Sequence, residues 1–155
     1  MLIILLNTNM PAGKYDIIAE RGASFKIHFD YLYAGDGGTG IDLSNFTCDM
    51  QVRKSPLDEK ILMHLSTFGL TYGGTTGFYQ PGIISGITGV GGINLNSDVF
   101  GLPSDGGILI TANDVVTQSL PFGRHFYDIK LTDSVSNNVV RLLEGNFEVT
   151  KEVTR

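Results

Sequence analysis

Only a few side chains in this sequence could take part in metal or acid–base chemistry, and they are scattered. The three histidines, His28, His64 and His125, lie on three different segments that are expected to be strands. A zinc site would need ligands from such distant segments to converge. We therefore expect no metal and no cofactor. We interpret His125, which lies beside Phe126 and Tyr127, as a partly buried packing residue.

Two glycine-rich segments are similar to ligand-binding loops but lack the residues that such loops need. Residues 34–42 do not place an acidic residue at every second position, as a calcium loop would, and Asp36-Gly37 is a strong hairpin-turn signal. Residues 86–92 are not followed by the Lys-Ser or Lys-Thr of a phosphate-binding loop. The sequence also has no nucleophile elbow and no catalytic carboxylate pair, so we do not expect an enzyme.

Three aromatic residues, Tyr72, Phe78 and Tyr79, lie in a glycine-rich stretch of the chain. Such residues could stack on a sugar, but more often they pin a loop to a core or to another subunit. We favour the second interpretation. The single cysteine, Cys48, lies in an expected strand, and we interpret it as a small buried hydrophobic residue rather than a reactive thiol.

The composition excludes several classes of partner. The 155 residues include 16 acidic and 11 basic ones, for a net charge of −5, and an acidic chain is a poor partner for nucleic acid. The apolar residues 2–6 are too few to span a bilayer and lack the pattern of a signal peptide, so we expect no membrane partner. We expect them to form part of an N-terminal arm, residues 1–13, that packs as a strand on this domain or on a neighbour, and we favour another subunit.

Alternation of apolar and polar residues predicts strands over 14–20, 23–33, 46–53, 61–65, 125–131 and 140–150. Each long strand has one dry and one wet face, as in an antiparallel sheet. The phase slips near Leu142 and Leu143, which predicts a β-bulge. Asn113 is expected to cap a single helical turn over residues 114–119. The sequence therefore predicts an all-β antiparallel sandwich, immunoglobulin-like or jelly-roll-like, with at most one short helix.

Residues 66–107 differ in character from the rest of the chain. Twelve of the twenty glycines fall between residues 69 and 107, and charges are few there. We interpret residues 66–107 as a long Gly/Thr-rich insertion in a single sandwich domain that spans residues 14–155. We expect that deleting residues 69–107 leaves a folded monomer that no longer assembles.

Seven short motifs occur in a characteristic order: YDI at residues 15–17, ERGASF at 20–25, IDLSNF at 41–46, MQVRKS at 50–55, PFGRHFYDI at 121–129, RLLEG at 141–145 and EVTR at 152–155. Their order and spacing resemble a small family of tailed-bacteriophage virion proteins of the contractile-tailed marine and cyanobacterial type, together with related baseplate and tail-adaptor domains. The resemblance covers most of the chain outside residues 1–13 and 66–107. It implies a β-sandwich of structural role with no catalytic motif.

The resemblance further implies a structural component of the virion, in the tail or baseplate, that is made in the host cytoplasm. Its partners would be other virion proteins and copies of itself. A host-glycan-binding module of the tail and a head or neck decoration protein are the alternatives. The expected contact residues lie in the arm, in the insertion and at the C-terminus: Leu2, Ile3, Ile4, Leu5, Leu6, Tyr72, Phe78, Tyr79, Ile83, Ile84 and Arg155.

Two motifs also carry structural expectations. Tyr127 is expected to bury its ring while its hydroxyl makes a hydrogen bond. Arg53 and Lys54, and Arg141 near Glu144, are expected at the rim of a sheet, where ion pairs set register more than stability. The edge of the C-terminal strand is expected to invite a partner strand.

Overall fold

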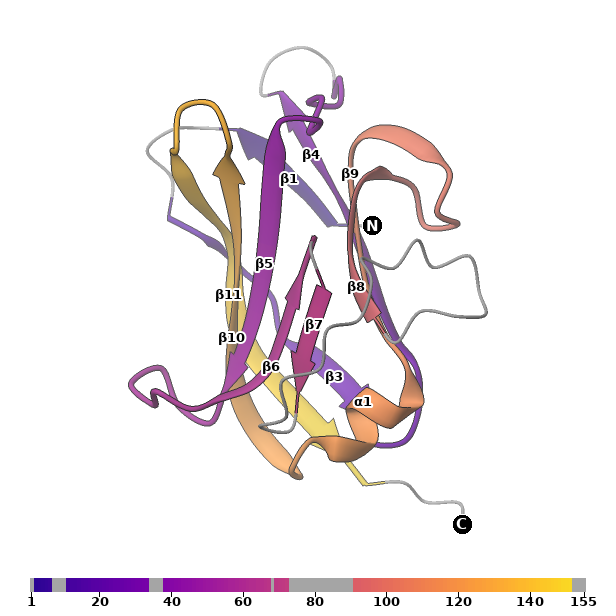
Figure 1. Ribbon diagram of the computed structural model, residues 1–155, viewed down its shortest axis with the longest axis vertical. Coiled ribbons are helices and arrows are strands. Elements are labelled where there is room, and N and C mark those ends of the chain that lie inside the picture. The colour runs from indigo at the N-terminus through magenta and orange to yellow at the C-terminus, as the bar shows by residue number, and fades with distance from the viewer. Residues whose placement is uncertain (1, 7–10, 34–37, 68, 73–90, 152–155) are drawn as a thin grey trace.

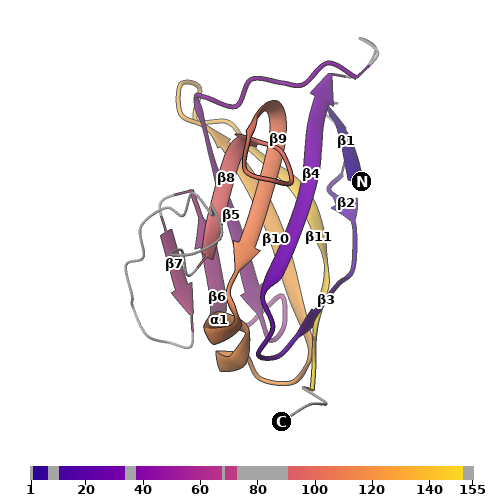
Figure 2. The ribbon, with the colours of Figure 1, turned by 90° about the vertical axis from the view of Figure 1, so that its right-hand side faces the viewer.

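The computed structural model describes residues 2–6, 11–33, 38–67, 69–72 and 91–151, and of residues 2–6 and 69–72 it describes the backbone alone. These residues form two β-sheets that pack face to face, with one short helix at one end (Figures 1 and 2). In Figure 1 the sandwich is seen edge-on, with β10 and β11 on the left and β8 and β9 on the right. Figure 2 faces the smaller sheet.

The smaller sheet has four strands, in the order β1 (Leu2–Leu6), β4 (Phe25–Tyr33), β9 (Pro103–Ala112) and β8 (Gly91–Ser97). The larger sheet has seven strands. Its order is β2 (Gly13–Lys14), β11 (Val139–Thr150), β10 (Gly123–Asp133), β5 (Phe46–Arg53), β6 (Ile61–Ser66) and β7 (Gly69–Tyr72), and β3 (Ile17–Glu20) pairs with β11 beyond β2.

This strand order is that of a variable-type immunoglobulin sandwich. Strands β4, β9 and β8 correspond to B, E and D, and strands β11, β10, β5, β6 and β7 correspond to G, F, C, C′ and C″. The prediction of an all-β sandwich is therefore confirmed, and the order selects the immunoglobulin-like alternative over the jelly roll. The disulfide and the core tryptophan of antibody domains have no counterpart, because the sequence has one cysteine and no tryptophan.

The N-terminal segment departs from the expected antiparallel pattern. Strand β1 pairs with β4 in parallel, and both β2 and β3 pair with β11 in parallel. The segment thus adds an edge strand first to the smaller sheet and then to the larger sheet. The backbone of residues 2–6 hydrogen-bonds within its own chain, so the arm packs on this domain, and its contact with another subunit stays a prediction.

Alternate residues of both sheets meet in one core. Phe29 and Ile110 of the smaller sheet, and Met50, Ile129 and Phe147 of the larger sheet, are all fully buried. The interpretation of Cys48 is also confirmed: its side chain is 0% exposed. Burial raises the pKa of the Cys48 thiol, so the thiolate that reacts with oxidants and metals is disfavoured.

Three local predictions are confirmed. Ile129 lies opposite Leu143 and Lys130 lies opposite Arg141, so Leu142 is the extra residue of a bulge. Helix α1 spans Asp114–Ser119, and the Asn113 side chain accepts a hydrogen bond of 3.2 Å from the backbone N–H of Val116.

The turn after β4 is partly as predicted. The backbone N–H of Tyr33 donates to the carbonyl of Thr39 (3.0 Å), and the N–H of Ile41 donates to the carbonyl of Tyr31 (3.1 Å). The chain therefore folds back on β4 like a hairpin, and then crosses to the larger sheet as β5. Tyr33, which ends β4, is 42% exposed.

Residues 66–107 are not an insertion outside the sandwich over their whole length. They include β7, β8 and the first half of β9, and Ile93 in β8 is only 2% exposed. Their glycines allow close approach of backbone: a Cβ at Gly107 would overlap the carbonyl of Ser97, and one at Gly106 (φ 79°) would overlap that of Tyr31. Residues 73–90 lie outside the described part of the chain.

Candidate functional site

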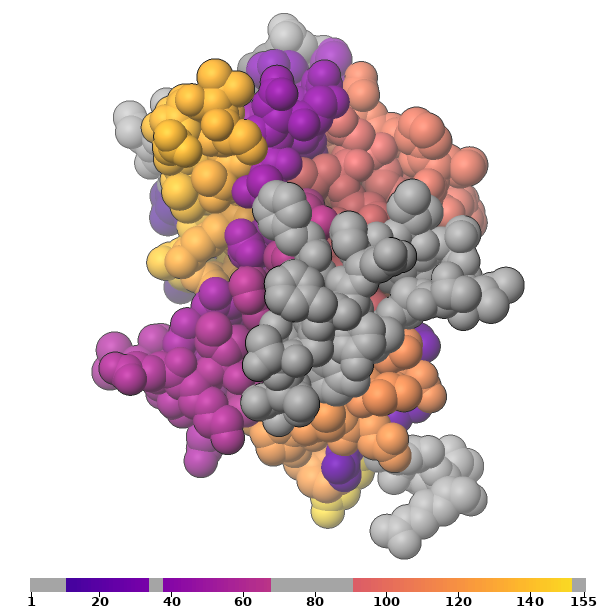
Figure 3. Space-filling view, viewed as in Figure 1, coloured from indigo at the N-terminus to yellow at the C-terminus, as the bar shows by residue number. Residues whose placement is uncertain are grey.

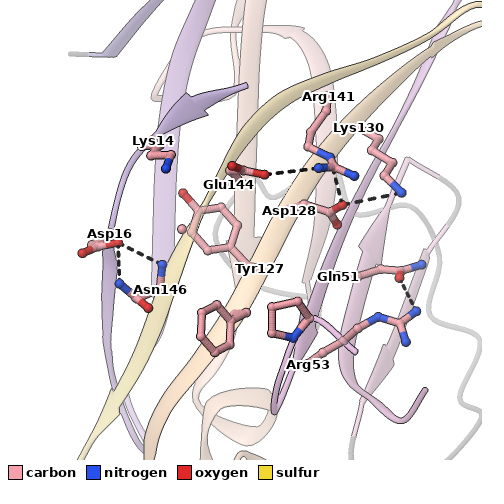
Figure 4. A pocket seen from close by; sticks show the side chains of 13 residues that line it. Lys14, Asp16, Gln51, Arg53, Tyr127, Asp128, Lys130, Arg141, Glu144 and Asn146 are labelled. Carbon is pink, nitrogen blue, oxygen red and sulfur yellow. Dashed lines mark hydrogen bonds and ion pairs between the residues drawn. The ribbon is translucent and has the colours of Figure 1, made fainter. Parts of the chain in front are cut away.

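The outer face of the larger sheet is hollowed into an open groove of about 640 Å³, which we call the charged groove (Figure 4). It crosses strands β2, β11, β10 and β5. The strand register places its residues in rows, because directly opposed residues of neighbouring strands point to the same face. The charged groove is lined by Lys14, Asp16, Gln51, Arg53, Pro56, Phe126, Tyr127, Asp128, Lys130, Arg141, Glu144, Gly145 and Asn146.

One row runs straight across four strands. Lys14 lies opposite Glu144, Glu144 opposite Asp128, and Asp128 opposite Gln51. The next row holds Asn146, Phe126 and Arg53. The Phe126 side chain is 38% exposed, so an apolar ring lies among charged neighbours.

The carboxylates in the middle of the charged groove are already paired. Asp128 lies 3.5 Å from both the Nζ of Lys130 and the Nε of Arg141. The Nη1 of Arg141 also donates to Glu144 at 3.2 Å, but the pair lies on β11 between β2 and β10 and not at the rim of the sheet, where it was expected. These pairs are partly exposed to water, so they fix side-chain positions more than they stabilise the fold.

The segment between β2 and β3 forms one wall of the charged groove and is firmly attached. Tyr15 donates through its backbone N–H to the carbonyl of Glu144 (3.1 Å), and its own carbonyl accepts from the Tyr127 hydroxyl (2.6 Å). The prediction for Tyr127 is thus confirmed, since its residue is 4% exposed and its hydroxyl is bonded. Gly145 has no side chain because a Cβ there would overlap the Tyr15 carbonyl.

Asp16 belongs to the same wall. One carboxylate oxygen accepts from the backbone N–H of Asn146 (2.9 Å) and from its side-chain amide (3.0 Å). These two bonds, the backbone bond first, hold the pKa of Asp16 below its ordinary value of 3.8. The carboxylate therefore fastens the N-terminal segment to β11 while it is ionised.

We predict that this fastening is lost in acid. The folded-state pKa of Asp16 is lowered, so its contribution to stability is complete above pH 3.8 and disappears as the pH falls through the folded-state pKa. Asp16→Asn should therefore lower the urea midpoint at pH 6 more than at pH 3, measured by circular dichroism. An equal loss at both pH values would contradict this role.

A second surface lies on the turn between β8 and β9, residues 98–102, which we call the apolar turn. Phe100 is 77% exposed, Leu102 is 60% exposed and Val99 is 39% exposed. The Asp98 carboxylate holds the turn, because one of its oxygens accepts from the backbone N–H of both Phe100 and Leu102 at 2.8 Å. The turn stands at the upper right of the molecule in Figures 1 and 3.

The three histidines are engaged separately. His28 Nε2 lies 3.0 Å from the carbonyl of Ser97, His64 Nε2 lies 2.7 Å from Asp49, and His125 Nε2 lies 2.8 Å from the carbonyl of Pro121. His125 is 3% exposed and bonds four residues back at the start of β10, as the corner tyrosine does in immunoglobulin domains. Within the described ranges no three His, Cys, Asp or Glu side chains come together as metal ligands would.

The contact residues predicted from the sequence are only partly placed. Residues Leu2, Ile3, Ile4, Leu5 and Leu6 form β1 at the edge of the smaller sheet, and Tyr72 ends β7, with their backbone alone described. Phe78, Tyr79, Ile83, Ile84 and Arg155 lie outside the described residues. Their roles as contacts stay predictions.

The charged groove and the apolar turn were not predicted as sites. The alternation of β10 did assign Phe126, Asp128 and Lys130 to one outer face, but it did not show which strands lie beside them.

Among the described residues, no helix has the length and apolar character needed to cross a membrane. No protein-family model matches this chain, and no curated protein matches it either.

Proposed function

We propose that this chain is a structural component of a bacteriophage virion, in the tail or baseplate, that acts by protein–protein assembly. The order of the seven motifs supports the virion assignment, and the sandwich agrees with the fold that the resemblance implies. The single observation that carries the assembly role is the apolar turn, which presents Phe100 and Leu102 to solvent on an ordered backbone.

The apolar turn has the physical character of a contact anchor. Burying a Phe or Leu side chain contributes about 1.5–3 kcal/mol each. The entropic cost of ordering the turn on binding is small, because Asp98 already fixes its backbone. Exposure of an aromatic ring to water is unfavourable in the isolated molecule. Burial of the ring against a partner removes this cost and contributes to binding.

The test is a double variant, Phe100→Ser with Leu102→Ser. We expect the urea midpoint to stay unchanged, because both side chains are exposed, and we expect incorporation into virus particles to fall about tenfold or more, measured by immunoblot of purified particles. The matched control is Leu57→Ser, an apolar side chain that is 94% exposed in the turn between β5 and β6. It should leave incorporation unchanged.

A density map of the assembled particle, with this chain traced, shows whether the chain lies in the tail or baseplate or in the head or neck. Absence of the chain from the particle, or a solvent-facing Phe100 within it, would refute the proposal. A place on the head or neck would favour a decoration protein instead. Saturable binding of host envelope glycans by the purified chain would favour the glycan-binding alternative, whose aromatic residues Phe78 and Tyr79 lie outside the described part of the chain.

A further inference from the structure

Within the described residues, two cationic side chains of the charged groove, Arg53 and Lys14, form no ion pair. The Nη1 of Arg53 donates to the backbone carbonyls of Asp58 (2.7 Å) and Glu59 (3.0 Å). The Nη2 of Arg53 donates to the side-chain oxygen of Gln51 at 2.8 Å. All three acceptors are neutral, so the positive charge of the guanidinium is not balanced by an ion pair within the described residues.

The guanidinium of Arg53 is therefore fixed in a position in which it can bind an anion. A guanidinium has five N–H donors, and within the described residues three of them are bonded, so the Nε–H and one Nη2–H have no acceptor there. A carboxylate binds a guanidinium through its charge and through N–H groups of this kind. Because the backbone already fixes the group, little further side-chain entropy is lost on binding.

Lys14 is the second cation. Its exposed side chain lines the opposite end of the charged groove, on β2, and within the described part of the chain its Nζ has no ion pair or hydrogen bond. Lys14 and Gln51 belong to one row across four strands, so they lie roughly 14 Å apart at the usual strand spacing. Arg53 is two residues farther along β5.

The unbalanced positive charges of Arg53 and Lys14 favour a ligand that carries negative charge. The negative charges of Asp128 and Glu144 are balanced by Lys130 and Arg141, and one oxygen of Asp16 accepts from Asn146, so these carboxylates do not balance Arg53 or Lys14. Arg53 is displaced by about 7 Å along β5, so its Cα lies about 16 Å from that of Lys14. The long side chains of both residues can reach acidic side chains at positions i and i+4 of an extended peptide, which lie about 13 Å apart and point to the same side. The residue between them, at i+2, would then face the exposed ring of Phe126.

We propose that the charged groove binds an extended acidic segment of a partner protein, with one carboxylate on Arg53, a second on Lys14 and an apolar side chain against Phe126. This inference rests on the proposed function in taking the partner to be a protein of the same assembly. It names the chemistry of that partner: acidic residues four apart with an apolar residue midway. Arg53 and Lys14, the two cations of the charged groove without an ion pair in the described residues, thus complement an acidic strand on a neighbour.

The experiment titrates the ¹⁵N-labelled full chain with the acetylated heptapeptide Ser-Glu-Thr-Val-Thr-Glu-Ser and follows backbone amide shifts by NMR. We expect saturable shifts confined to strands β2, β11, β10 and β5. The Kd should rise roughly fivefold or more for Lys14→Gln and for Arg53→Lys, and it should also rise between about 50 mM and about 500 mM salt. Lys60→Gln, an exposed lysine that does not line the charged groove, should leave the Kd unchanged.

Several outcomes would overturn the inference. They are equal binding of the peptide with both Glu replaced by Gln, equal loss in Lys60→Gln, and no saturable shifts at all. Saturable binding of polygalacturonate in place of the peptide would assign the charged groove to acidic saccharides instead. A dimer of the chain alone that Lys14→Gln abolishes would assign it to a second copy.

The Arg53 variants carry a separate control, because Arg53 also holds the turn after β5. Their urea midpoints should be measured, and if Arg53→Lys does not fold, Lys14→Gln still decides the outcome. Failure here can be told apart from failure of the assembly proposal. The apolar turn shares no residue with the charged groove, and its variants are scored by incorporation into particles.

Discussion

Deleting residues 69–107 is expected to unfold the protein rather than leave a folded monomer. The deletion removes β7, β8 and half of β9. It takes Ile93 and Leu95 out of the core, and each lost aliphatic side chain of this kind costs about 2–5 kcal/mol. Because a whole domain is stable by only about 5–15 kcal/mol, the remaining chain should not fold cooperatively. Thermal unfolding followed by circular dichroism should show no transition.

A shorter change provides the control. Replacing residues 73–90 with a Gly/Ser linker removes no described core residue, so we expect a cooperative transition close to that of the wild type. If the chain without residues 69–107 still unfolds cooperatively, strand β8 is dispensable and the assigned strand order of the smaller sheet is wrong.

The contrast between these two variants shows where the sequence pattern misleads. The glycines of residues 91–107 favour the interpretation of this segment as a long insertion, because alternation of side chains is hard to follow where side chains are missing. In the structure Gly91, Gly106 and Gly107 are there because neighbouring backbone leaves no room for a Cβ. Residues 106–112 are, moreover, all buried, so β9 has no wet face for alternation to reveal.

Strands that do have a wet and a dry face were predictable almost to the residue. The clearest are β4, β5, β10 and β11, and the bulge at Leu142 was visible as a slip in their alternation. The cap at Asn113 was also predictable, since its side chain acts within its own helix turn. Each of these signals is local to one element.

Strand neighbours are not a local property, and so neither surface could be predicted. Periodicity tells which side of β10 is wet, but it does not tell that β11 and β5 lie on either side of it, or that β2 brings Lys14 to the far end. The parallel pairing of the N-terminal strands could not be predicted either, because a parallel and an antiparallel edge strand of a few residues have the same pattern of apolar and polar residues. The charged groove exists only once those four strands are side by side.

The strand order also shows which core residue supports the wall of the charged groove formed by Tyr15 and Asp16. Phe147 on β11 is 0% exposed, and it packs edge-on against Phe25 (ring centroids 5.6 Å apart) and Tyr127 (6.5 Å). Its backbone pairs with Ile17 of β3, which follows the wall formed by Tyr15 and Asp16. One side chain thus links the two sheets and supports the segment over Gly145.

Phe147→Ala is expected to lower the free energy of unfolding by about 3–5 kcal/mol, because it removes a large buried ring and leaves a cavity between two aromatic neighbours. The matched control is Phe126→Ala on the outer face of β10, where a ring that is 38% exposed should cost less than about 1 kcal/mol. Urea titrations of both variants measure the difference. A loss in Phe147→Ala no larger than in Phe126→Ala would mean that β11 does not face the smaller sheet as assigned, and the charged groove on its other side would then lose its structural basis.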